Sequence, residues 1–204
     1  MVRHLVLVLV LALASSVLLA SPGFAQEVES DQPAEAVAMI GPMVGAPAPS
    51  LEGVETIEPD AVPATPTDAG LALVFVRSAD WCPYCKTQLG ELNDAVAPLA
   101  AAGWRLSAIS YDSPALLEAF SKDQALDFAL LSDPGSEVIR AFNLLNEDMK
   151  PSSRAYGIPH PAVVFIRADG TVGAVLREEG FKTRPTVESV VDTAMLLNEA
   201  ATGL

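Results

Sequence analysis

An unbroken run of six apolar residues, Leu71–Val76, leads within a few positions to two cysteines spaced three apart. Such a run is typical of a strand buried on both faces, as in a parallel sheet. After the second cysteine, apolar residues recur at helical spacing as far as Gly103, where a helix commonly ends. The cysteine pair is therefore predicted to lie where a buried strand turns into an amphipathic helix.

The rest of the chain alternates between strand and helix patterns. The expected strands are 105–110, 128–131 and a hairpin over 162–176, and the expected helices are 115–124, 136–145 and one that begins near Thr186. This order of elements predicts an α/β sandwich in which helices flank a mixed β-sheet with an antiparallel edge.

The first 25 residues have the three parts of a secretory signal peptide. Arg3 and His4 precede an apolar run, and small residues lead to an expected cleavage after Ala25. We therefore expect export to the bacterial periplasm or the extracellular space. An uncleaved signal would instead tether the chain to the membrane, because the apolar run approaches the length of a bilayer span.

The chain has a formal charge of −14, and part of this negative charge is concentrated in the segment that follows the predicted signal peptide. Residues 26–42 are acidic and contain prolines, which predicts an extended linker before a folded domain at 43–204. A chain this acidic repels phosphate backbones and offers no polybasic surface. Nucleic acid is therefore excluded as an expected partner.

The segment Trp81–Cys85 is the candidate catalytic site. At the first turn of a helix, unpaired N–H groups and the helix dipole favour a thiolate, so Cys82 is expected to be the attacking sulfur. Pro83 suits the first helical position. Cys85, one turn further into the helix, is the expected resolving thiol, and Trp81 would shield the pair from water.

Two structural interpretations of the cysteines remain open, namely two buried free thiols or half of a zinc site. A structural zinc site needs four ligands, and beyond the signal segment the only histidine is His160. No metal or other cofactor is therefore expected. A copper-handling module that uses Cys82, Cys85 and His160 as ligands is the remaining metal-based hypothesis.

The stretch 77–89, RSADWCPYCKTQL, resembles the active-site segment of the thioredoxin superfamily, specifically its redoxin branch, the AhpC/TSA group. VGAPAPSL at 44–51 resembles the entry segment of redoxin domains, and GIPHPAVVFI at 157–166 resembles a later strand. The resemblance covers about Met43 to Leu197. It implies a thioredoxin-like three-layer sandwich with redox activity at the cysteines.

The resemblance also implies roles near the cysteine pair. Pro161 falls at the position of the cis-proline that packs beside the disulfide in thioredoxin-like proteins. His160 would then face the pair, where an imidazolium would stabilise the Cys82 thiolate. Pro83-Tyr84 resembles the glutaredoxin dipeptide, a local likeness that places Tyr84 at the site. Arg77 lies close enough in sequence to reach it from the strand end.

Several positions depart from the family pattern. Peroxiredoxins place a proline and a threonine or serine before the reactive cysteine and an arginine on a later strand, whereas this chain has Phe75, Ala79 and Pro161 at the matching positions. Thioredoxins carry a buried acid at the position of Val76. Because the peroxide-binding residues are missing, peroxidase activity ranks below disulfide exchange. Because the buried acid is missing, efficient disulfide reduction is not expected from the pattern alone.

Three functions follow from these residues. Exported thiol–disulfide exchange ranks first, with protein or small-molecule disulfides and thiols, and a redox partner protein, as the partners. A peroxiredoxin-like thiol peroxidase ranks second, because a low-pKa thiolate reacts with peroxide and Cys85 can resolve the product. The copper-handling module ranks third.

Overall fold

The structure is a computed structural model that describes residues 39–56 and 68–203. These residues belong to one compact unit, 38–204. The predicted signal peptide and residues 26–38 of the predicted linker lie outside the described residues. Within the described ranges, no helix has both the length and the apolar character needed to cross a membrane.

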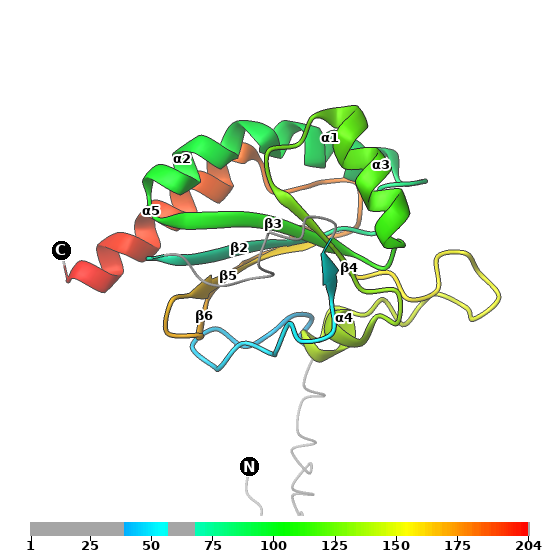
Figure 1. The fold of residues 1–204 in the computed structure, drawn as a ribbon. Coiled ribbons are helices and arrows are strands. Elements are labelled where there is room, and N and C mark those ends of the chain that lie inside the picture. Colours follow the sequence, from blue (N-terminus) through cyan, green and yellow to red (C-terminus); the bar gives the residue numbers. More distant parts are fainter. Residues whose placement is uncertain (1–38, 57–67, 204) are drawn as a thin grey trace, which may run out of the picture. The chain divides into compact units, whose positions relative to one another are not determined.

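Twelve elements follow one another along the described chain (Figure 1). They are β1 (Glu55–Thr56), β2 (Gly70–Phe75), α1 (Pro83–Glu91), the 3-10 helix η1 (Leu92–Ala95), α2 (Val96–Ala101), β3 (Trp104–Ser110), α3 (Pro114–Gln124), β4 (Ala129–Ser132), α4 (Glu137–Ala141), β5 (Ala162–Arg167), β6 (Val172–Leu176) and α5 (Val187–Thr202).

The strands form one sheet in the order β1-β4-β3-β2-β5-β6. The central strands β2, β3 and β4 are parallel to one another, whereas β1 pairs with β4, β5 with β2 and β6 with β5 in the antiparallel sense. The predicted α/β fold with a mixed sheet and an antiparallel edge is therefore confirmed. Strand β2 lies near the middle of the sheet, as its unbroken apolar sequence indicated.

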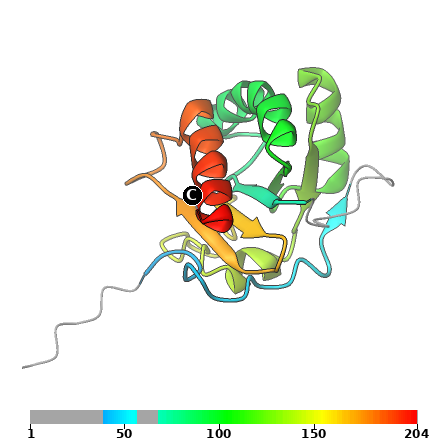
Figure 2. The same cartoon turned by 90° about the vertical axis from the view of Figure 1, so that its left-hand side faces the viewer.

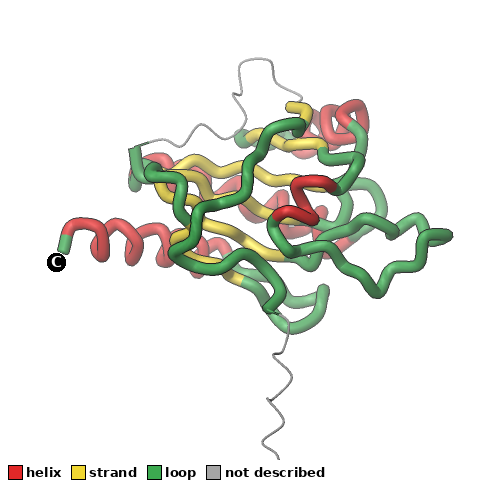
Figure 3. The backbone as a smooth tube through the Cα atoms, turned by 90° about the horizontal axis from the view of Figure 1, so that it is seen from below, coloured by secondary structure: helices red, strands yellow, loops and turns green. Residues whose placement is uncertain are grey.

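Alternate side chains of β2, and that of Val76 directly after it, enter two separate cores. Ala72, Val74 and Val76 join the core beneath α1, α2, α3 and α5 (Figures 1 and 2). Leu71, Leu73 and Phe75 join the second core, beneath α4 and the segment before β1. Figure 3 shows this second face, where loops and the short α4 supply most of the cover. The result is the three-layer thioredoxin-like sandwich that the sequence predicted.

The helix after the cysteine pair is interrupted, which the apolar periodicity did not predict. The chain passes from α1 through the 3-10 turn η1 before α2 begins. Pro98 explains the interruption, because it has no N–H to donate to the carbonyl of Asp94. Leu89, Leu92 and Leu99 nevertheless all point into the first core.

The helix expected at 136–145 is shorter than predicted. It ends at Ala141, and Asn143 adopts a left-handed backbone with φ 54°. The Leu144 carbonyl then accepts a hydrogen bond from the His160 backbone N–H at 2.6 Å. The apolar residues past 141 therefore fill the second core from a loop that is tied to the segment before β5.

Candidate active site

The two cysteines lie at the junction between β2 and α1, as predicted. Cys82 is the N-cap of α1 with an extended backbone, and Pro83 is the first helical residue. The Cys85 backbone N–H donates to Cys82 Sγ at 3.2 Å. The two sulfurs form a disulfide with a Cα–Cα distance of 5.3 Å. The helix N-terminus therefore places one backbone N–H, that of Cys85, against the Cys82 sulfur.

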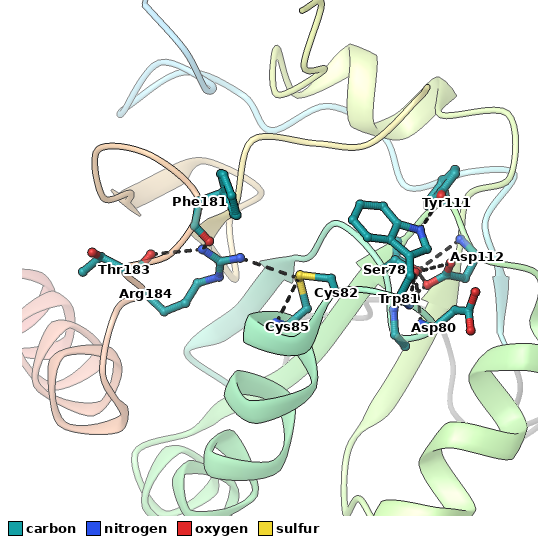
Figure 4. The surroundings of a disulfide bond; sticks show 12 residues. Ser78, Asp80, Trp81, Cys82, Cys85, Tyr111, Asp112, Phe181, Thr183 and Arg184 are labelled. Atoms are coloured by element: carbon teal, nitrogen blue, oxygen red, sulfur yellow. Dashed lines mark hydrogen bonds between the residues drawn. A yellow bond between two sulfur atoms is a disulfide. The ribbon is translucent and has the colours of Figure 1, made fainter. Parts of the chain in front are cut away.

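Both cysteines are closed off from solvent. Cys82 is 1% exposed and Cys85 is fully buried. The segment 177–186, between β6 and α5, reaches the pair through Arg184 and is called the capping loop below. Most of this loop is exposed, from Glu178 to Thr183. The loop therefore lies on one side of the buried redox pair (Figure 4).

Arg184 connects the capping loop to the disulfide (Figure 4). Its Nη2 lies 3.6 Å from Cys85 Sγ. Its Nη1 donates to the carbonyl oxygens of Phe181 and, at 3.1 Å, of Thr183. Arg184 thus stabilises the turn of the loop, and its guanidinium contacts the Cys85 sulfur. Nothing in the sequence singled out this residue, because an arginine in a polar loop far along the chain belongs to no motif.

Arg77 supplies a second positive charge, from the end of β2. Its guanidinium lies 4.3 Å from the ring centroid of Phe181 and 5.1 Å from that of Trp81. Such cation–π contacts attract Phe181 of the capping loop toward the segment before the cysteines. Phe181 also meets Tyr84 edge-on, with ring centroids 6.0 Å apart. The predicted placement of Arg77, Trp81 and Tyr84 near the pair agrees with these contacts.

Arg77 and Arg184 have no acidic partner within the described ranges. Among the described residues, neither guanidinium has a carboxylate within ion-pair distance, and the Nε atoms of both are buried without a hydrogen bond. The pKa of Arg184 is lowered to about 10, mainly by burial and further by the charge of Arg77. The pKa of Arg77 is also lowered, chiefly by burial. Both remain protonated at neutral pH.

Trp81 is fixed on the other side of the disulfide (Figure 4). Its indole N–H donates to the Tyr111 hydroxyl at 2.9 Å, and that hydroxyl donates to the Arg154 carbonyl at 2.6 Å. The Arg154 guanidinium lies 5.0 Å from the indole centroid. Burial is the main cause of a raised pKa at Tyr111. The tyrosine therefore stays protonated as the acceptor for Trp81.

A buried carboxylate organises the loop that precedes the cysteines. Asp112, 7% exposed, follows β3 and accepts hydrogen bonds from Ser78 Oγ at 2.9 Å, the Ala79 N–H at 2.6 Å and Ser110 Oγ at 2.9 Å. Ser78 Oγ in turn accepts from the Asp80 N–H at 3.0 Å. These bonds tie the segment 78–80 to the end of β3. Sequence spacing gave no sign of this contact.

His160 and Pro161 lie at the same end of the sheet as the cysteines, because they directly precede β5, whose first residue, Ala162, pairs with Phe75. The charges of Arg177 and Asp148 act on the His160 side chain. The peptide bond before Pro161 is trans, so the expected cis-proline is not found. The role of His160 in stabilising the Cys82 thiolate stays a prediction.

The pKa of His160 is lowered, mainly by burial and then by the charge of Arg177. As the pH falls through the usual histidine range, the unfolded chain therefore takes up this proton before the folded protein does. We expect the free energy of unfolding to decrease between about pH 7.5 and 5.5, and His160→Gln to flatten that dependence. Chemical denaturation of both proteins across this range measures the difference. A wild type that gains stability relative to the variant on acidification would contradict the burial effect.

A metal site is not formed in the described part of the chain. No group of three His, Cys, Asp or Glu side chains there is placed to hold an ion. The ligand set of the copper hypothesis, Cys82, Cys85 and His160, is therefore not assembled in this structure.

Comparison with known proteins identifies relatives. The model described as AhpC/TSA family matches residues 44–175. The chain is 32% identical over 120 residues to a putative peroxiredoxin bcp of Haemophilus influenzae, covering 59% of this chain and 76% of that protein. Peroxiredoxin Bcp of Escherichia coli K12 is 32% identical over 111 residues, covering 54% and 69%. The solved structure of peroxidoxin BcpB from Mycobacterium tuberculosis has the same fold, with a TM-score of 0.57, 18% identity and coverage of 79% and 98%.

Proposed function

Because the chain belongs to the AhpC/TSA family, we propose that it is a thiol peroxidase in which a hydroperoxide oxidises Cys82 and Cys85 then forms the disulfide. Its relatives named peroxiredoxins support a thiol-based redox enzyme and favour this reaction over general disulfide exchange. The order of the two hypotheses drawn from the sequence is therefore reversed.

The burial of the sulfur pair is the observation that carries the proposal. Cys82 is 1% exposed. Disulfide exchange needs the attacking thiolate to approach the substrate sulfur, so its rate depends on access. A hydroperoxide is much smaller than the disulfide-bearing segment of a folded protein, so burial of the sulfur favours the hydroperoxide as the substrate. The same burial protects the oxidised sulfur from over-oxidation before Cys85 can react.

The reaction balances with the two cysteines and an external reductant. The Cys82 thiolate attacks the peroxide, the O–O bond breaks, and an alcohol leaves with a proton while Cys82 becomes a sulfenic acid. Cys85 attacks that sulfur, the disulfide forms and water leaves. Two electrons from a small thiol or a redox partner protein then regenerate both thiols. The disulfide between Cys82 and Cys85 is the product of the second step.

The helix N-terminus supplies the activation at Cys82. Its sulfur accepts the Cys85 backbone N–H, and such contacts stabilise a thiolate. The positions that carry a proline and a threonine in the peroxiredoxin pattern hold Phe75 and Ala79, which are 0% and 2% exposed. The chain therefore lacks those two peroxide-orienting residues. The positive charges beside the pair come instead from Arg77 and Arg184.

Disulfide exchange remains the second candidate, because the redox pair is a CxxC at the start of a helix, the arrangement that resembles thioredoxins. The two candidate functions can be distinguished by how fast the reduced protein reacts with a hydroperoxide and with a protein disulfide. The reduced protein is mixed with hydrogen peroxide, with cumene hydroperoxide, and with insulin as a protein disulfide, and the loss of free thiol is followed over time.

We expect hydroperoxides to oxidise the protein about a thousandfold faster than they oxidise free cysteine, a modest acceleration for an enzyme. Insulin should react slowly, since its disulfides have poor access to the buried pair. Faster reaction with insulin than with either hydroperoxide would reverse the ranking and make disulfide exchange the function.

A further inference from the structure

The contact between Arg184 and Cys85 joins residues 99 positions apart in the sequence. The guanidinium Nη2 lies 3.6 Å from Cys85 Sγ, within the range for a hydrogen bond to sulfur. Arg184 reaches the sulfur from the capping loop, on the side opposite Trp81 (Figure 4). A buried, charged donor is thus held against the resolving sulfur, which lacks the helix N-terminal N–H that serves Cys82.

Among the described residues, no negative charge pairs with Arg184 while the cysteines are oxidised. The chain has 26 Asp and Glu residues, yet no described carboxylate lies within ion-pair distance of Arg184 or Arg77. Two unpaired arginines that repel each other in a partly buried site are unfavourable without a negative charge nearby. Reduction of the disulfide would provide such a charge, because thiolates replace two neutral sulfurs.

We propose that Arg184 is a catalytic residue that stabilises the thiolate of Cys85 once the disulfide is reduced. Each sulfur then has its own donor: Cys82 accepts the backbone N–H at the helix start, at 3.2 Å, and Cys85 accepts the guanidinium. Cys85 keeps its expected role as the resolving residue, and in this proposal it reacts as a thiolate.

The other charged groups around the pair leave Arg184 as the dominant neighbour of Cys85. Arg77, from the end of β2, adds positive charge through its contacts with Phe181 and Trp81. Asp112 and Asp80 lie on the far side of Trp81, and the Asp112 carboxylate is occupied by three donors (Figure 4).

Three further groups complete the surroundings. Lys86, which follows Cys85 on α1, is exposed, as is the ring of Tyr84 on the same helix. His160, from the segment before β5, interacts with Arg177 and Asp148. The charge that contacts the Cys85 sulfur is therefore positive, which lowers a thiol pKa.

This role deepens the proposed peroxidase reaction and rests on it for its kinetic meaning. A Cys85 thiolate attacks the sulfenic acid of Cys82, the S–S bond forms, and hydroxide leaves and takes a proton from water. Arg184 stays protonated throughout. Stabilising the Cys85 thiolate also stabilises the reduced form, so the disulfide becomes a stronger oxidant and is more readily re-reduced.

The pKa of Cys85 can be measured without peroxide, so the test is independent of the proposed function. In a Cys82→Ser background, the rate of alkylation of Cys85 by iodoacetamide is followed against pH. Arg184→Gln should raise the midpoint by about one unit or more, the usual effect of losing an adjacent opposite charge. Arg184→Lys should keep part of the shift, because the charge remains while the planar fork is lost.

Lys182→Gln is the matched control. It removes one positive charge from the same loop, and the Lys182 side chain is exposed. We expect its alkylation midpoint to equal that of the Cys82→Ser parent. Near-ultraviolet circular dichroism of each variant checks that the loop change leaves the fold intact.

A second readout uses both cysteines. The reduction potential of the pair in Arg184→Gln should be more negative than in the wild type, by a tenfold change in equilibrium constant or about 30 mV for this two-electron couple. An unchanged Cys85 midpoint together with an unchanged potential would overturn the role of Arg184. If Arg184→Gln shifts the Cys85 midpoint and the reduction potential as expected but the wild type consumes peroxide slowly, the role of Arg184 stands and the proposed peroxidase function is wrong.

Discussion

Cys82→Ser should reduce the rate of hydroperoxide consumption by about a thousandfold or more, the scale seen when an enzyme loses its nucleophile. A serine hydroxyl at the N-cap can still accept the Cys85 N–H, so the helix start should remain intact. Its pKa is far too high for it to ionise at neutral pH. The measurement is peroxide consumption in the presence of a chemical reductant, compared with the wild type.

Cys85→Ser is the informative companion to this variant. It should retain a single rapid turnover, after which a sulfenic acid accumulates at Cys82 and can be trapped by dimedone. If Cys85→Ser instead yields a mixed disulfide with an added protein substrate and no dimedone adduct after peroxide, the protein works by disulfide exchange. Peroxide consumption by Cys82→Ser at the wild-type rate would exclude Cys82 as the reactive sulfur.

Asp112→Ala should lower the free energy of unfolding by about 5 kcal/mol. Each hydrogen bond to a charged group contributes about 1.5–3 kcal/mol, and the change leaves Ser78 Oγ, the Ala79 N–H and Ser110 Oγ buried without this acceptor. The loss should extend to activity, because the segment 78–80 would no longer hold Trp81 beside the cysteines. Urea denaturation gives the stability, and peroxide kinetics give the activity.

Two companions make this result interpretable if Asp112→Ala does not fold. Asp112→Asn keeps one acceptor oxygen and should cost about half as much. Asp94→Ala removes an exposed carboxylate from η1 and should change the stability by no more than about 0.5 kcal/mol. A loss for Asp112→Asn no larger than that for Asp94→Ala would mean that this carboxylate does not stabilise the loop.

The fold was predictable because its elements have strong local patterns. The run Leu71–Val76 is apolar without interruption and forms a central strand, and the turn at 168–170 separates two strands that pair as a hairpin. Helix boundaries were less certain, because the break at Leu92–Ala95 and the early end of α4 depend on Pro98 and on a left-handed Asn143. Apolar periodicity continues through both interruptions and conceals them.

The active site was predictable only where its residues are close in sequence. Trp81, Cys82, Pro83, Tyr84 and Cys85 share one segment, and the structure keeps them together. Arg184 comes from a loop almost one hundred residues later, and Asp112 from the end of another strand. Their placement follows from how β3, β6 and α5 pack, which no spacing rule encodes.

The two sides of the redox pair are anchored very differently. On one side, buried hydrogen bonds to Asp112 fix the backbone. On the other, an exposed loop is fastened chiefly through one arginine and an aromatic contact. The side with Asp112 is held by buried hydrogen bonds, whereas the capping loop is held by few contacts. Because Phe181 and Thr183 hold Arg184 in place, a change in this loop would alter the charge that reaches the Cys85 sulfur while the backbone around Trp81 stays fixed.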